Sequence, residues 1–153
     1  MSWLNRCALL GCLAIFVALA ISGCSGNKPD TPQAVVEAFV KAIQEDDMAT
    51  AADLMAWQEI ARRQNPDWDN FPSSQRNLII GRLKQQKQGE LKHLAGFLRN
   101  ATVGQASVQG DGAEVIVTGS GATVVFDLIV EDGKQWRILT IRPRTQGPGG
   151  MGG

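Results

Sequence analysis

The chain has 153 residues, of which 44% are hydrophobic, and its 15 basic and 15 acidic side chains give a formal net charge of zero. This balance, without a basic stripe, argues against a nucleic-acid-binding surface. The length suits one domain with a core of its own.

The N-terminal segment has the three parts of a secretory signal. Arg6 precedes an uncharged run over residues 7–21, and two small residues follow that run. The next residue is Cys24, so residues 1–23 resemble a bacterial lipoprotein signal peptide with its lipobox. The resemblance implies cleavage before Cys24 and acylation of that cysteine. A retained transmembrane helix is the alternative, although the run falls short of the ~20 residues that span a bilayer.

The resemblance also implies a place in the cell. An acylated Cys24, carrying palmitate or similar chains, holds a protein stably to a membrane without a spanning helix. The domain would then face the periplasm of a bacterial cell envelope, and Ser25 favours the outer membrane over the inner one. Cys7 and Cys12 would be removed with the signal peptide, and Cys24 would be acylated. No thiol would then remain for a disulfide or a metal site.

Two further segments lie outside the predicted domain, which covers residues 31–143. Residues 24–30 are short and polar and are predicted to be a lipidated tether. Residues 144–153 are rich in glycine and cannot bury enough apolar surface to offset their ordering entropy. They are therefore predicted to be a disordered tail.

Helices are predicted in the first part of the domain. Thr31 is a good N-cap and Pro32 suits the first helical turn. The apolar residues at helical spacing that form the buried face of this helix are Val36, Phe39, Val40 and Ile43. Asp47 is predicted to cap a second helix that extends towards Arg62, and Asn65 before a proline ends it.

A third helix is predicted after a loop at residues 65–72. Ser73 or Ser74 is expected to cap it. Gly89 costs about 1 kcal/mol relative to alanine inside a helix, which predicts a bend or break near this position. The sequence leaves open whether residues 90–98 continue as helix or become a strand.

Strand patterns begin after residue 100. Four runs rich in β-branched residues are separated by short turns, at residues 103–108, 114–118, 123–131 and 134–142. Asp132-Gly133 predicts a type I′ hairpin turn. Short links favour an antiparallel meander, and helices followed by strands favour an α+β fold. The prediction is therefore N-terminal helices packed on a C-terminal four-stranded sheet.

Two short stretches resemble those of nuclear-transport-factor-2-like domains. One is Thr-Pro-x-x-Val-Val-x-x-Phe at residues 31–39, and the other is Asp-Gly-Lys-x-Trp-x-Ile at residues 132–138. The resemblance implies a cystatin-like cone, in which a curved antiparallel sheet wraps a helix. Its open end serves in that family as a ligand pocket, an active site or a protein interface, so the fold does not select the function.

An enzyme of the ketosteroid-isomerase or dehydratase kind is one alternative. It needs a carboxylate or a histidine in an apolar pocket, and the weak candidates are Asp127 and His93. Asp127 shares a strand face with Val125 and Ile129 and is predicted to lie on the solvent side. The chain contains no tyrosine, a common oxyanion donor in such enzymes. We therefore expect no enzyme activity.

A binding function rests on the aromatic residues. Trp68 and Phe71 in the loop, together with Trp57, are the candidates for contact with a small hydrophobic ligand or a protein partner. Trp136 is predicted to fill the core. One histidine without a free cysteine supplies no zinc site, and we predict no metal or cofactor. The prediction is a lipid-anchored, non-enzymatic binding module, with a structural part in an envelope complex as a further alternative.

Overall fold

The structure is a computed structural model, and it describes residues 29–144. The predicted signal peptide, Cys24 and residues 145–153 of the predicted tail lie outside the described residues, as does most of the tether. Within residues 29–144, no helix combines the length and the apolar character needed to cross a membrane.

The first helix, α1 (Pro32–Gln44), confirms the prediction from the sequence. The hydroxyl of Thr31 accepts a hydrogen bond from the backbone N–H of Ala34 at 3.2 Å, which caps the first turn. The four residues predicted to form its buried face, Val36, Phe39, Val40 and Ile43, are all buried.

Two short helices replace the single helix that was predicted to follow. They are α2 (Met48–Asp53) and α3 (Trp57–Gln64). Asp47 caps α2, since its carboxylate accepts a hydrogen bond from the N–H of Thr50 at 3.0 Å. Asn65 ends α3 as predicted.

The interruption at residues 54–56 is caused by the last strand, β4 (Gln135–Pro143). The N–H of Ile138 donates to the carbonyl of Leu54 at 2.9 Å, and the N–H of Ala56 donates to the carbonyl of Ile138 at 2.8 Å. These backbone groups pair with a strand some eighty residues away in the chain. Helical periodicity alone contains no signal for that pairing.

A single long helix, α4 (Ser73–Leu98), follows a 3-10 turn, η1 (Trp68–Asn70). The prediction that Ser73 or Ser74 caps α4 is wrong, because both serines lie inside the helix, which begins after Pro72. A break near Gly89 is excluded, because α4 runs unbroken through this residue and includes residues 90–98. Leu91 and Leu98 are buried in the core and stabilise the helix beyond Gly89. Such packing contributes more to helix stability than the propensity of a single residue does.

The strands form the predicted antiparallel meander. The first three are β1 (Thr102–Gln109), β2 (Gly112–Gly119) and β3 (Ala122–Glu131), and the sheet order is β1-β2-β3-β4. Asp132 and Gly133 have φ values of 54° and 65°, as a type I′ turn requires. The α+β class is therefore confirmed.

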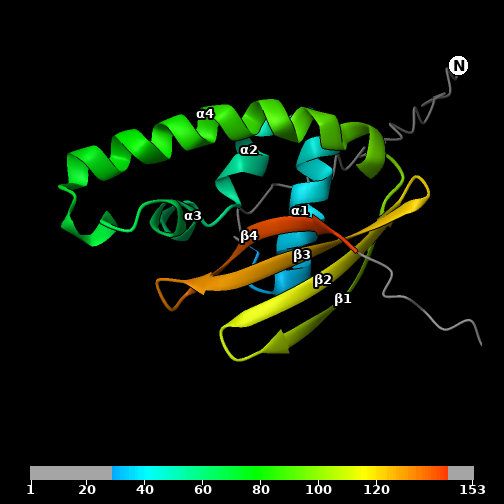
Figure 1. Ribbon diagram of the computed structural model, residues 1–153. Coiled ribbons are helices and arrows are strands. Elements are labelled where there is room, and N and C mark those ends of the chain that lie inside the picture. Colours follow the sequence, from blue (N-terminus) through cyan, green and yellow to red (C-terminus); the bar gives the residue numbers. More distant parts are fainter. Residues whose placement is uncertain (1–28, 145–153) are drawn as a thin grey trace, which may run out of the picture.

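The core lies between α1 and one face of the sheet. Figure 1 shows α1 crossing that face, with α2 and α3 between β4 and the long helix α4. Phe39 and Phe126 meet edge to face at the centre, with ring centroids 5.5 Å apart. All residues of the core cluster fall between Val35 and Ile138, so the domain carries a complete core and is expected to fold without the segment that precedes it.

Candidate functional site

A cavity of about 400 Å³, with both apolar and polar side chains in its lining, lies between α3, α4 and β4, and we call it the α3–α4 groove. Its apolar wall includes Trp57, Ile60, Leu83, Leu91, Leu94 and Ile141. A volume of this size and a wall of this kind are typical of sites for small molecules.

Local structure explains why the groove forms beside β4. The isolated pairing with Met55 occupies the edge of this strand at Ile138. Leu139 then forms a bulge, because Asp127 pairs with Thr140 while the next residue of β3 pairs with Ile138. Beyond the bulge the strand lines the groove.

The face of α4 that lines the groove carries one charged pair among its leucines. Leu83, Lys87, Glu90, Leu91 and Leu94 share this face at helical spacing. The ammonium of Lys87 lies 2.5 Å from the carboxylate of Glu90, and both side chains are substantially exposed. This ion pair lowers the pKa of Glu90. The charges therefore neutralise one another at the rim.

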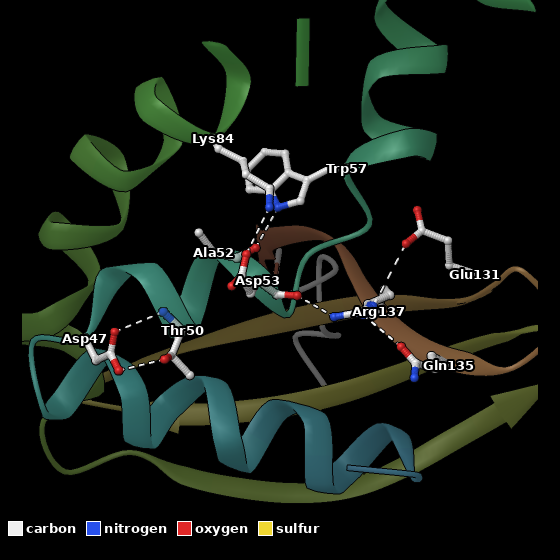
Figure 2. Close-up of polar contacts among 9 residues, drawn as sticks. All are labelled: Asp47, Thr50, Ala52, Asp53, Trp57, Lys84, Glu131, Gln135 and Arg137. Atoms are coloured by element: carbon white, nitrogen blue, oxygen red, sulfur yellow. Dashed lines mark hydrogen bonds and ion pairs between the residues drawn. The ribbon is translucent and has the colours of Figure 1, made fainter. Parts of the chain in front are cut away.

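A second cavity of about 500 Å³, whose lining includes more charged side chains than that of the groove, lies at the β3–β4 turn, and we call it the hairpin cleft. Its polar lining includes Asp53, Lys84, Glu131, Gln135 and Arg137, most of which Figure 2 shows in contact with one another. Met55 and Trp57 line both cavities. The groove and the cleft therefore meet at the α2–α3 junction.

Most polar groups of the hairpin cleft already have partners. The ammonium of Lys84 binds the carboxylate of Asp53 at 2.9 Å. The guanidinium of Arg137 donates to the side-chain carbonyl of Gln135 at 2.8 Å and to the backbone carbonyl of Asp53. Its ion pair with Glu131 is long, at 4.0 Å between Nε and Oε2 (Figure 2).

Glu131 is the exception in the cleft. Its Oε1 atom is buried and has no hydrogen-bond partner among residues 29–144. Burial raises the pKa of Glu131, and the charge of Asp132 adds to that effect, while Arg137 and the backbone N–H groups of Gln58 and Glu59 oppose it. A buried oxygen without a partner is costly, so Glu131 has unused capacity to accept a hydrogen bond.

Trp57 is held rigidly in the wall that the two cavities share. Its ring is 6% exposed, and its Nε1 donates to the backbone carbonyl of Ala52 at 2.6 Å. The structure thus places this predicted binding residue at both cavities. Trp136 does not fill the core as predicted: it is half-buried, packs against the core cluster and lines the hairpin cleft.

The interpretation of Trp68 as a surface contact needs correction. Trp68 is only 1% exposed and packs edge to face on the half-buried Phe71, with ring centroids 6.3 Å apart. Both residues lie outside the linings of the groove and the cleft. The 3-10 turn packs against α3 and buries the Trp68 ring within the loop, which the loop composition did not reveal.

The two weak catalytic candidates also lie outside both cavities. Asp127 binds Arg142 through contacts of 2.8 and 3.0 Å, and Arg142 also binds Glu114 at 2.6 Å, on the sheet face opposite the core. His93 is exposed on α4. The carboxylate that the sequence analysis missed is Glu131, whose burial depends on the helices that cover the hairpin.

Groups of three or more His, Cys, Asp or Glu side chains placed to hold a metal ion are absent from residues 29–144. Comparison of the chain with protein-family models, with curated proteins and with solved structures finds no match. The arrangement offers an apolar groove and a charged cleft, joined at Trp57.

Proposed function

We propose that this chain is a lipid-anchored, non-enzymatic binding module of a bacterial cell envelope. In this proposal it is attached through acylated Cys24, faces the periplasm, preferably from the outer membrane, and holds a small hydrophobic ligand in the α3–α4 groove. The observation that carries the proposal is the apolar wall of the groove. A ligand that covers this wall gains about 25 cal/mol for each Å² of apolar surface removed from water.

We also infer that the domain is a nuclear-transport-factor-2-like cone. The two sequence stretches of the resemblance support this inference, since one forms the start of α1 and the other forms the β3–β4 hairpin. A helix across one face of a four-stranded sheet is compatible with such a cone. The α3–α4 groove would then be its open end, where members of that family bind ligands.

Two matched leucine variants on α4 test the groove. Leu94 lines it, whereas Leu78 lies outside both cavities and is 56% exposed. An uncharged fluorescent probe, N-phenyl-1-naphthylamine, is expected to bind the wild-type domain and Leu78→Gln equally well. Leu94→Gln should weaken binding roughly tenfold, because it places a polar group in the apolar wall. Equal binding to all three proteins, or to none, would contradict the proposal.

Acylation is tested at Cys24 itself. Radiolabelled palmitate supplied to the expressing bacteria should enter the wild-type protein and should not enter Cys24→Ser. The wild type should also sediment with membranes. Equal labelling of the two proteins would refute lipidation at this residue and would leave the test of the groove unaffected.

A further inference from the structure

We propose that the hairpin cleft is the headgroup subsite for an amphiphile that carries a primary ammonium, with its apolar chain in the α3–α4 groove. This inference rests on the proposed function, because it assigns a polar end to the hydrophobic ligand. It follows from two cavities that share Met55 and Trp57 in their linings, one with leucines along its wall and the other with four charged side chains.

The two cavities share one wall at Met55 and Trp57, which are 3% and 6% exposed. Trp57 is fixed by its hydrogen bond to Ala52, whereas Met55 has an unbranched, adaptable side chain. In this proposal, a ligand that spans the wall has one part in the groove and the other in the cleft. The ligand that uses both cavities is therefore apolar at one end and polar at the other.

The charges of the cleft select the polar end. Lys84 is bound by Asp53, and Arg137 is engaged by Gln135 and a backbone carbonyl. Glu131 has the weakest side-chain partner of these groups, a long ion pair, and its Oε1 lacks a hydrogen-bond partner, although the backbone N–H groups of Gln58 and Glu59 also favour its charged form. An ammonium offers three donors and a full positive charge, so it satisfies that oxygen better than a hydroxyl does.

Aromatic surface in the cleft favours the same headgroup. Trp57 and Trp136 both line it. The face of an indole ring attracts a cation, most strongly where water is partly excluded. A carboxylate headgroup would meet the negative charge of Glu131 and would gain nothing from the rings.

The position of the cleft suits an amphiphile that comes from a membrane. Pro29 belongs to its lining. Pro29 follows Cys24 by five residues, which span at most about 18 Å when fully extended. An anchor at Cys24 would therefore keep the cleft within reach of the bilayer surface.

Three ligands with the same eight-carbon chain test the subsite: octylamine, 1-octanol and octanoate. They are titrated by calorimetry into the chain from Ser25 onward, which retains the whole described core. Octylamine should bind roughly tenfold more tightly than 1-octanol, and octanoate should bind most weakly. Glu131→Gln should abolish the preference for the amine and leave the affinity for 1-octanol unchanged. Asp127→Asn, which removes a carboxylate from the opposite face of the sheet, should keep the preference.

The outcomes separate the two proposals. Equal affinity for octylamine and 1-octanol, unaltered by Glu131→Gln, would overturn the ammonium subsite and leave the apolar groove standing. Failure of all three ligands to bind would overturn the proposed function itself.

The wild-type protein provides a second test that needs no folded variant. Affinity for octylamine should fall as the pH drops and Glu131 takes up a proton, while affinity for 1-octanol should stay level. The other charged groups around the cleft are Asp53, Lys84, Arg137 and Asp132. A pH profile that is identical for the two ligands would overturn the proposal.

Liposomes distinguish the two sources of such an amphiphile. Phosphatidylcholine vesicles are prepared with and without phosphatidylethanolamine and floated with the same soluble domain. Flotation that depends on the ethanolamine lipid assigns a membrane lipid as the ligand. Binding of octylamine without such flotation assigns a free amine, and both results support the ammonium subsite.

Discussion

Two carboxylate–arginine pairs join β3 to β4, and they differ in their hydrogen bonds and in the segments that cover them. Asp127 and Arg142 make two short contacts on the outer face of the sheet, with Glu114 beside them. Glu131 and Arg137 lie 4.0 Å apart where the hairpin meets the helices. The first pair is saturated with hydrogen bonds, and the second leaves a buried oxygen unused.

The cover over the hairpin accounts for this difference. Residues 54–56 pair with β4 and carry α3 across the hairpin, which removes Glu131 from water. The outer face has no such cover at Asp127 within residues 29–144. The two carboxylate side chains are similarly exposed, but Arg142 is 46% exposed and Arg137 only 23%, so the outer pair contributes little to stability. Asp127 and Arg142 therefore form an ion pair on the outer face of the sheet, whereas Glu131 and Arg137 line a cavity.

Removing the side chain of Trp57, which forms part of the cover over Glu131, should have the largest effect on stability. Trp57→Ala deletes a buried ring, so we expect it to lower the free energy of unfolding by about 3–5 kcal/mol in urea titrations. Opening of the cavity wall should also return the pKa of Glu131 towards its ordinary range, as carbon-detected NMR titration can show. Trp57→Phe, which keeps a ring and loses the hydrogen bond to Ala52, should cost less. An unchanged pKa in the alanine variant would show that the cover does not cause the shift.

Loss of each arginine compares the two pairs directly. Arg137→Gln leaves Glu131 buried beside an uncharged group, and we expect a loss of about 1–2 kcal/mol at pH 7. The Arg137 side chain is 23% exposed, which limits the cost below that of a fully buried pair. Arg142→Gln should destabilise less, because water solvates its partners. Equal losses in the two variants would contradict the contrast between the faces.

The stability difference between Glu131→Gln and the wild type should be smaller than the losses above, and it should change with pH in a defined direction. Because the folded state raises the pKa of Glu131, it binds more protons than the unfolded state at pH values above ~4.3, the ordinary value for glutamate. This residue therefore stabilises the fold less as the pH rises through that window. Thermal melts should show that Glu131→Gln removes this contribution, so the variant gains stability relative to the wild type as the pH rises. A difference that stays constant with pH would contradict the raised pKa.

The smallest effect is expected at the outer pair. Asp127→Asn should change the melting temperature slightly, and the change should shrink in 1 M salt because exposed charges are screened. In the same melting experiments, the difference in melting temperature between Arg137→Gln and the wild type should change less with salt. A stronger salt response at Arg137 would reverse the assignment of the two environments.

Local rules predicted much of this fold because the interactions concerned lie within a few residues. Thr31 caps α1, Asp47 caps α2, and Asp132 opens the hairpin turn, each through contacts with near neighbours in the chain. The alternation of β3 also placed Asp127 on the face opposite the core. These features need no knowledge of the rest of the molecule.

The failed predictions depend on contacts between distant segments. The break between α2 and α3 exists because Leu54 and Ala56 pair with Ile138. Glu131 enters a cavity because α3 covers its hairpin, and nothing in its immediate sequence distinguishes it from an exposed residue before a turn. The burial of Trp68 depends instead on a neighbouring segment, because the 3-10 turn packs on α3, which ends at Gln64.

The central claim is that the domain holds a small hydrophobic ligand in the α3–α4 groove. The most direct measurement is native mass spectrometry of the chain from Ser25 onward, exported to the periplasm and purified without detergent. The account predicts a reproducible excess mass that Leu94→Gln lowers and Leu78→Gln retains. A wild-type spectrum at the sequence mass alone would contradict it.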